Sequence, residues 1–168
     1  MSTQPVSVSR TKRASLAGWL SYLHCRFKYY AARLESPFLL LVRLYWGWQF
    51  TQTGWGKLHN LPHVREFFAS LGIPAPGVMA PMIASLEFFG GMLLIVGLAT
   101  RLTGLLLACN MFVAYVTSDR QALNSFLSDP GKFYIADPFT FLFASLIALI
   151  FGAGFFSLDY FFSHRRKR

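Results

Sequence analysis

Charged side chains are scarce in this sequence, and their scarcity limits the class of protein. Only 14% of the 168 residues are Asp, Glu, Lys or Arg, whereas 54% are hydrophobic. An average soluble domain is about 25% charged. Several runs approach the ~20 apolar residues that a helix needs to cross ~30 Å of hydrocarbon. A soluble globular domain is therefore disfavoured, and we expect an all-α integral membrane protein.

Cysteine and histidine are also rare. The two cysteines, Cys25 and Cys109, form no CxxC motif, so neither a disulfide framework nor a structural zinc site is supported. Among the four histidines, His59 and His63 lie close together and precede Glu66, but a proline interrupts the helix that would align these three as ligands. We therefore expect no metal or haem, and no dithiol exchange by this chain alone.

Acidic residues are outnumbered, seven against sixteen Lys and Arg, which gives a net charge of +9. On a soluble protein such an excess would suggest nucleic acid. Here the basic residues gather before the first apolar run, in the 99–101 turn and after the last run. The loops of the other side hold only Lys57, Arg65, Arg120 and Lys132. The positive-inside rule explains this distribution, so we expect a multi-pass protein with both termini cytoplasmic and no nucleic-acid partner.

Apolar runs and helix-breaking residues divide the chain into segments. Residues 1–14 are polar and basic, which indicates a disordered tail, and residues 163–168 form a basic cytoplasmic tail. We predict a four-helix transmembrane bundle, with spans at about 37–54, 77–98, 102–118 and 138–158. Pro37 opens the first span. In the loop that follows this span, Gly72 is placed to cap a short helix.

Residues 15–36 predict an N-terminal amphipathic helix. At 100° per residue its apolar side chains fall within an arc of about 100°, and its basic side chains lie outside that arc. The arc contains Leu16, Trp19, Leu20, Leu23, Phe27, Tyr30 and Leu34. We expect this helix to lie in the cytoplasmic headgroup region of the bilayer. A soluble amphipathic helix packed on the bundle is the alternative.

Glu87 is a lone carboxylate inside the second predicted span. With a rise of ~1.5 Å per residue it lies roughly 16 Å from the cytoplasmic side, and Gln49 and Asn110 lie at roughly 18 Å and 13 Å. Ser145 on the fourth span has a similar depth. A charge at mid-bilayer costs ~2.5–3.5 kcal/mol, so Glu87 should face the bundle interior among these polar groups.

Two cations are candidate partners of Glu87. Side chains lean toward the N-terminus of their own helix, so Arg43, at roughly 9 Å, and Glu87 lean apart, and Arg43 can snorkel instead of pairing. Lys57 is either an interfacial anchor beside Trp55 or a cation that closes the outer mouth of a cavity over Glu87. Without a cationic partner, burial favours the neutral acid.

Structural residues are expected in the second span and in the turn after it. Glycines allow a neighbouring helix to approach closely, and a threonine can cap the third span. The residues in question are Gly90, Gly91, Gly97, Thr100 and Arg101.

Several motifs resemble those of the DoxX family of small four-span membrane proteins. They are Arg43, "GWGKL" (Gly54–Leu58), "FFASLGIPAP" (Phe67–Pro76) and "EFFGGMLLIVGLATR" (Glu87–Arg101). The resemblance covers the four-span domain, residues 37–162, and leaves the amphipathic segment outside. It implies a location in the bacterial inner membrane. It also implies, for some members, redox work in thiosulfate:quinone oxidoreductase, quinone resistance, or thiol and oxidative-stress defence.

Three functions fit these observations. The first is an accessory subunit of a redox complex, with Glu87 handling a proton, with Arg43, Gln49, Lys57 and Asn110 as further ligand-binding candidates, and with quinone as the candidate ligand. The second is a non-enzymatic scaffold in which Glu87 only fixes helix register and the basic tail recruits anionic lipid or a partner. The third is a small-solute permease, in which case a homo-oligomer is possible. We expect a subunit rather than a stand-alone enzyme.

Overall fold

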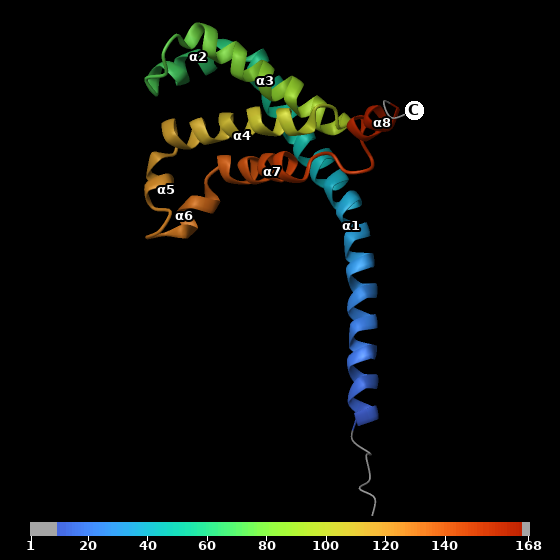
Figure 1. Cartoon of the computed structure of the whole chain (residues 1–168). Helices are drawn as coiled ribbons and strands as arrows, with labels where there is room; N and C mark the ends of the chain where they lie inside the picture. Colours follow the sequence, from blue (N-terminus) through green and yellow to red (C-terminus); the bar gives the residue numbers. More distant parts are fainter. Residues whose placement is uncertain (1–9, 166–168) are drawn as a thin grey trace, which may run out of the picture. The chain divides into compact units, whose positions relative to one another are not determined.

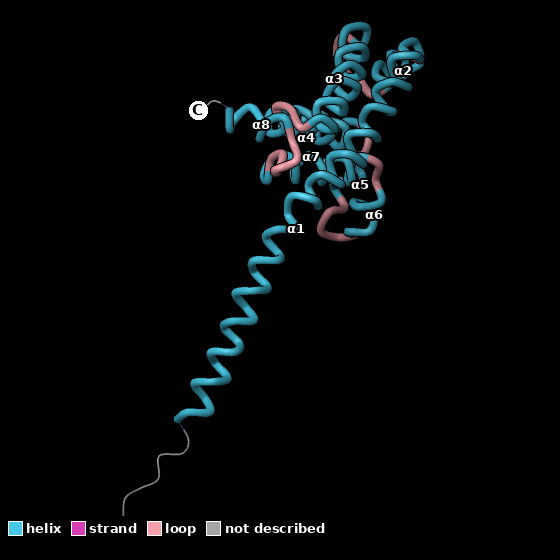
Figure 2. Tube along the Cα trace, turned by 90° about the vertical axis from the view of Figure 1, so that its right-hand side faces the viewer, coloured by secondary structure: helices cyan, strands magenta, loops and turns pink. Residues whose placement is uncertain are grey.

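The computed structural model describes residues 10–165, which form eight helices and no strand (Figures 1 and 2). This confirms the all-α fold class. The chain divides into two units, residues 1–35 and residues 36–168. Helix α1, Arg10–His59, contributes to both units, and each unit is described by itself.

Helix α1 differs from the prediction at both of its ends. It begins at Arg10, inside the segment predicted to be a disordered tail; residues 1–9 of that tail lie outside the described part of the chain. Pro37 lies within the helix instead of opening it. A proline removes one backbone donor from the helix, a cost that flanking hydrogen bonds can outweigh. The helix then continues beyond the expected end at Gly54, so the "GWGKL" motif is helical.

The second unit contains the remaining helices. They are α2 (Leu61–Ser70), α3 (Pro76–Val96), α4 (Thr100–Thr117), α5 (Arg120–Asn124), α6 (Pro130–Ile135), α7 (Pro138–Phe151) and α8 (Leu158–Arg165). Helix α4 packs against both α3 and α7, and α2 packs against α3 (Figure 1). Residues 166–168 of the predicted basic tail lie outside the described residues.

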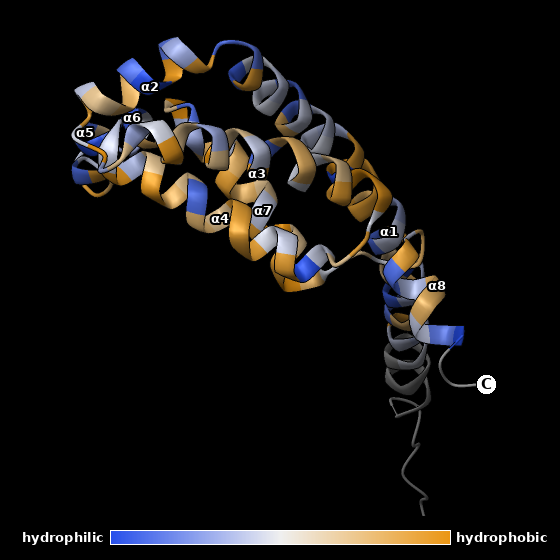
Figure 3. Cartoon of the chain, turned by 90° about the horizontal axis from the view of Figure 1, so that it is seen from above, coloured by the Kyte–Doolittle hydropathy of each residue, from blue (hydrophilic) through white to orange (hydrophobic). Residues whose placement is uncertain are grey.

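Two of the described helices, α3 and α4, are long and apolar enough to cross a membrane. Helix α7 is also apolar but has only 14 residues. The segment predicted as a span over 138–158 is therefore a continuous helix only as far as Phe151. The helix ends at Phe151 because Gly152 and Gly154 take left-handed conformations, with φ of 77° and 69°. Figure 3 shows the apolar residues along α3, α4 and α7.

Gly72 ends α2 as the sequence predicts. Its φ is 73°, its N–H donates to the carbonyl of Ala69, and the N–H of Ile73 donates to the carbonyl of Phe68. This is the Schellman arrangement, which satisfies two orphan carbonyls at a helix end and favours glycine. The chain can therefore turn directly from α2 toward α3.

The predicted cap at the start of α4 is wrong. The Thr100 hydroxyl is buried without a hydrogen-bond partner. Instead the carboxylate of Asp159, in the first turn of α8, accepts hydrogen bonds from the N–H groups of Ala99 at 2.7 Å and Thr100 at 2.8 Å. A carboxylate is well suited to this position because it meets both orphan donors and the positive end of the helix dipole.

The second unit is apolar on its surface and polar at several points of its interior. Its apolar core consists of Phe50, Leu94, Leu107, Met111 and Ala148. Several buried side chains are polar or charged, among them Arg43, Glu87, Asn110 and Ser145. Large apolar side chains are exposed on every long helix, among them Leu41, Val78, Phe112 and Ile150. Such a surface indicates apolar surroundings. Ionisable side chains buried inside a protein in such surroundings mark functional sites or sites that fix the register of the helices.

Candidate functional site

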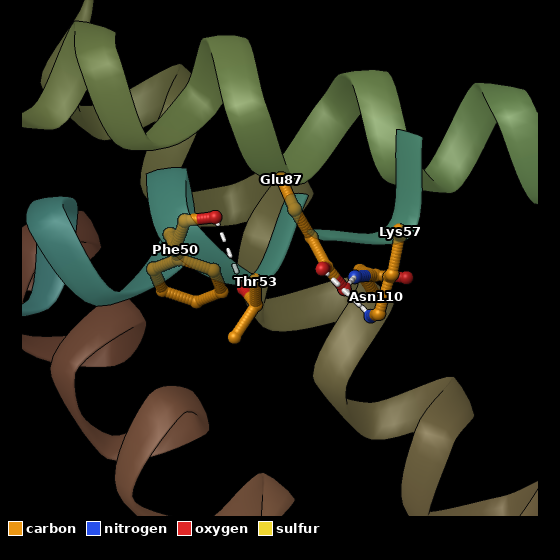
Figure 4. A network of polar contacts seen from close by, with 5 residues as sticks. All are labelled: Phe50, Thr53, Lys57, Glu87 and Asn110. Atoms are coloured by element: carbon orange, nitrogen blue, oxygen red, sulfur yellow. Dashed lines mark hydrogen bonds and ion pairs between the residues drawn. The ribbon is translucent and has the colours of Figure 1, made fainter. Parts of the chain in front are cut away.

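The carboxylate of Glu87 on α3 is the centre of a buried polar cluster (Figure 4). The ammonium of Lys57, from the end of α1, donates to both Oε1 and Oε2 at 2.6 Å. Asn110, from α4, donates from Nδ2 to Oε1 at 3.0 Å. Three helices therefore contribute one polar side chain each to a single hydrogen-bonded group. The distances are those of a charge-assisted pair between a carboxylate and an ammonium.

Lys57 reaches Glu87 because α1 approaches α3 unusually closely. A Cβ atom added to Gly54 would lie 2.7 Å from Cα of Phe88 and 2.8 Å from the carbonyl oxygen of Ala84. These distances are shorter than any real Cβ contact, so only glycine fits there. Lys57 is one helical turn beyond Gly54, and Phe88 is the residue next to Glu87. The glycine contact thus places the ammonium beside the carboxylate.

The two partners of the ion pair differ in burial. The Glu87 side chain is 1% exposed, whereas that of Lys57 is 35% exposed. The carboxylate therefore depends on Lys57 and Asn110 for its stabilisation, because it has lost its hydration. About one third of the Lys57 side chain remains accessible from outside the cluster.

The cluster lies in the wall of a cavity of about 840 Å³. Side chains from α1, α2, α3, α4 and α7, together with the 118–119 and 134–138 segments, line it, and most of its lining is apolar. Rings of Phe50 and Phe141 pack edge to face at 4.7 Å on one side. Lys57, Glu87 and Asn110 all line the same cavity. A mostly apolar cavity with a few convergent polar groups is the common form of a small-molecule site.

Of the residues predicted to lie at the depth of Glu87, only Asn110 contacts it. Gln49 is half-buried and does not line the cavity. Ser145 is fully buried, but its hydroxyl donates to the carbonyl of Phe141 in its own helix. Equal depth therefore did not determine contact, because depth says nothing about which face of a helix a side chain occupies.

Arg43 belongs to a second polar cluster. It is 1% exposed, and its Nη2 donates to the carbonyl of Phe156. Asp159 lies close enough to interact with it electrostatically. A Cβ on Gly97 would collide with the guanidinium, which explains glycine at that left-handed position. Arg43 is thus buried against the α3–α4 turn and does not snorkel, and Gly97 is about 15 Å along α3 from Glu87.

The remaining residues predicted to be structural differ in how closely they approach neighbouring helices. Gly91 lies directly against α1, where an added Cβ would be 2.5 Å from the carbonyl oxygen of Gly47. Gly90 faces the side chain of Leu107 on α4 at 3.2 Å. Arg101 is exposed, and its guanidinium lies near Gly152.

The histidines and cysteines take no part in the Glu87 cluster. His59 Nδ1 lies 3.0 Å from the carbonyl oxygen of Trp55, and His63 lines the cavity. Across residues 10–165, no three His, Cys, Asp or Glu side chains are grouped as a metal would require. Cys25 and Cys109 are both exposed.

Sequence reasoning missed several residues of the cavity and of the second cluster. The cavity is also lined by Tyr134, within the 119–137 segment, and by Phe141, just after it. In the sequence both read as ordinary aromatic residues. Asp159 acts across sixty residues of chain. In the sequence Asp159 is an acidic residue shortly before a basic tail. This position does not indicate which groups it contacts.

Comparisons with known proteins agree on one family. The DoxX family model matches residues 38–120. A protein of Bacillus subtilis (strain 168) named "Putative oxidoreductase CatD" is 32% identical over 128 residues, which cover 76% of this chain and 89% of that protein. "Inner membrane protein YqjF" of Escherichia coli (strain K12) is 33% identical over 76 residues, 45% of this chain and 57% of that protein. No solved structure matches the chain significantly.

Proposed function

Because this chain belongs to the DoxX family, we propose that it is a multi-pass protein of the bacterial inner membrane that serves as an accessory subunit in redox metabolism. The cavity around Glu87 is its ligand site, and the ligand is a quinone or a similar flat, apolar ring. The observation that carries this proposal is the placement of the Lys57–Glu87–Asn110 cluster in the wall of a large, mostly apolar cavity.

In this proposal the chain crosses the membrane four times, through the α1 segment after Pro37 and through α3, α4 and α7. The exposed apolar side chains on all four helices support it. So does the excess of Lys and Arg at the ends that would be cytoplasmic. Helix α7, at about 21 Å, is shorter than the hydrocarbon core, and the bilayer can thin locally or the helix ends can adjust. The 55–76 and 119–137 segments then face outward.

Labelling with a membrane-impermeant maleimide tests this orientation. A variant that keeps Cys25 but carries Cys109→Ala should remain unlabelled in intact spheroplasts and become labelled after permeabilisation. A Ser70→Cys variant in a cysteine-free background should be labelled in intact cells, because Ser70 is exposed at the end of α2. Labelling of Cys25 in intact spheroplasts would contradict cytoplasmic termini.

The size and lining of the cavity support a flat apolar ligand. Its volume, about 840 Å³, lies within the range of ~300–1,000 Å³ that is common for small-molecule sites. Phe50, Phe141 and Phe68 offer aromatic faces and edges to a ring. One relative is named as an oxidoreductase, which favours a redox-active ring over other apolar ligands.

The polar cluster supplies recognition and a protonation site. Lys57 uses two N–H donors on Glu87 and retains a third, which can donate to a ligand oxygen. The Glu87 carboxylate can take up or release a proton at Oε2, while Asn110 holds Oε1. A bound quinone would supply the electron-accepting chemistry, and a partner protein would exchange the electrons, since the chain offers no adjacent thiol pair.

Analysis by mass spectrometry of small molecules that co-purify in native-lipid nanodiscs tests the proposal. The parent protein should retain quinone at close to one per chain. Glu87→Gln should retain several-fold less, because the neutral amide no longer holds the Lys57 ammonium in place.

A matched control is Glu66→Gln, which removes an exposed carboxylate on α2 that does not line the cavity. This variant should retain as much quinone as the parent. Only bulk phospholipid in all three samples would contradict the proposal and leave the non-enzymatic scaffold as the better account of the fold.

A further inference from the structure

The first unit contains a helical surface that the proposed function does not use. Within residues 18–35 every side chain is exposed. Large apolar side chains are prominent among them, including Trp19 at 60%, Phe27 at 72% and Leu34 at 67% exposed. These residues, together with Leu23 and Tyr30, fall within an arc of about 100° on the helix, which we call the apolar arc.

Arginines and tyrosines form an ordered band along one edge of the apolar arc. The Arg26 guanidinium donates from Nη1 to the hydroxyl of Tyr22 and from Nη2 to the hydroxyl of Tyr30, each at 3.0 Å. About two turns beyond Arg26, the Arg33 guanidinium lies 4.4 Å from the ring centre of Tyr29. At 100° per residue, both arginines lie about 20–40° outside the arc.

The band holds positive charge in a fixed place while leaving donors free. A guanidinium has five N–H donors, and the two tyrosine hydroxyls use two of those on Arg26. The same hydroxyls, first that of Tyr30 and then that of Tyr22, raise the pKa of Arg26, and a guanidinium is charged at every physiological pH in any case. Guanidinium groups fit phosphate oxygens in a fork geometry.

From these contacts we propose that the 18–35 surface binds a leaflet containing anionic phospholipid, with the apolar arc among the acyl chains and the Arg26–Arg33 band on the lipid phosphates. Charge complementarity favours anionic lipid as the binding partner of this surface. A second copy of the chain would bring the same cationic band against itself, and an acidic protein would leave the apolar arc uncovered. Tyrosine and tryptophan side chains with an apolar body and a polar tip are suited to the headgroup depth.

The helix provides its own matched control. Lys28 carries the same charge as Arg26 two residues away, but lies about 80° beyond the other edge of the apolar arc. None of the described contacts joins Lys28 to a tyrosine ring or hydroxyl. A leaflet that receives the arc should therefore meet the arginines and leave Lys28 in water.

Hydrogen exchange read by mass spectrometry on the full chain tests the proposal. The two samples are nanodiscs of phosphatidylcholine alone and nanodiscs of phosphatidylcholine mixed with phosphatidylglycerol. Amides of residues 18–35 should exchange more slowly in the mixed lipid. Arg26→Gln and Arg33→Gln should each lose about fivefold of this protection, since a basic residue at an anionic surface contributes ~1 kcal/mol. Lys28→Gln should lose less than twofold.

Two results would overturn the proposal. One is equal exchange in both lipids. The other is a loss of protection for Lys28→Gln as large as that for Arg26→Gln. Such a loss would indicate that the lipid is attracted by the net charge of the helix and not by one face of it. Protection that is the same in both lipids and disappears in discs holding one chain would assign the surface to a second copy instead. Exchange in residues 36–165 should stay unchanged in every variant and serves as the internal check on folding.

Discussion

Replacing Lys57 with methionine should lower the free energy of unfolding of the detergent-solubilised protein by about 2–3 kcal/mol. Methionine keeps the length and apolar stem of the side chain but leaves the Glu87 carboxylate buried with Asn110 as its one remaining partner. Loss of one partner of a buried pair costs about 3–5 kcal/mol. The expected value is smaller because Lys57 is 35% exposed, so part of its contribution is screened. Chemical unfolding followed by tryptophan fluorescence measures the difference.

The double variant Lys57→Met/Glu87→Leu separates the ion pair from packing. Removing both charges should bring stability back to within about 1 kcal/mol of the parent. The exposed pair of Lys132 and Asp129, at 3.4 Å, is the control, and Lys132→Met should change stability by less than about 1 kcal/mol. If Lys57→Met unfolds at the parent's denaturant concentration, the carboxylate does not depend on Lys57 and the cluster has been misread.

The local features of the fold were largely predictable because they depend on neighbouring residues. Glycine placed after an amphipathic stretch and followed by prolines predicted the end of α2 at Gly72. The need of a buried carboxylate for partners predicted that Glu87 would face the interior; in the structure Glu87 is 1% exposed and accepts a hydrogen bond from Asn110. Both inferences use rules of covalent geometry and desolvation that hold whatever the rest of the chain does.

The choice of the cation for Glu87 was not predictable in this way. The sequence left Lys57 open between an interfacial anchor and a cation over the carboxylate. The answer depended on how far α1 continues past Gly54, which brings Lys57 into the helix and one turn beyond the close contact with α3. Tertiary packing can extend a helix beyond the end that its local sequence suggests. The depth of a side chain in the bilayer, when counted from such an assumed helix end, is therefore unreliable.

Contacts between distant segments were also out of reach. The end of α7 at Phe151 could have been inferred from Gly152 and Gly154, which favour left-handed turns. The role of Asp159 could not, because its partners at Ala99 and Thr100 come from another helix. The segment after α7 returns to the α3–α4 turn through contacts that leave no periodic signal in the sequence.

Gly54→Ala should be among the most damaging single changes in the second unit, with a loss of at least about 2–3 kcal/mol of stability. The added methyl group would lie 2.7 Å from Cα of Phe88 and 2.8 Å from the carbonyl of Ala84. Both obstacles are backbone atoms, which no rotamer change can move. Helix α1 must then shift away from α3. The same unfolding measurement, run beside the parent, gives the value.

Gly56→Ala is the matched control, since Gly56 lies in the same helix and an added Cβ meets nothing within 4 Å. Alanine is a better helix former than glycine by about 0.5–1 kcal/mol, so this variant should be as stable as the parent or slightly more so. Equal stability of the two alanine variants would contradict the close packing of α1 on α3.

The Gly54 contact also links packing to the proposed function. A shift of α1 away from α3 would carry Lys57 with it and open the 2.6 Å contacts to Glu87. Gly54→Ala should therefore lose quinone retention at temperatures where it is still folded, whereas Lys57→Met/Glu87→Leu should lose retention while remaining stable. If Gly54→Ala lost stability but kept its ligand, the site would not depend on the approach of these two helices. Loss of both would show that the glycine sets the position of the lysine, and through it the chemistry of the cavity.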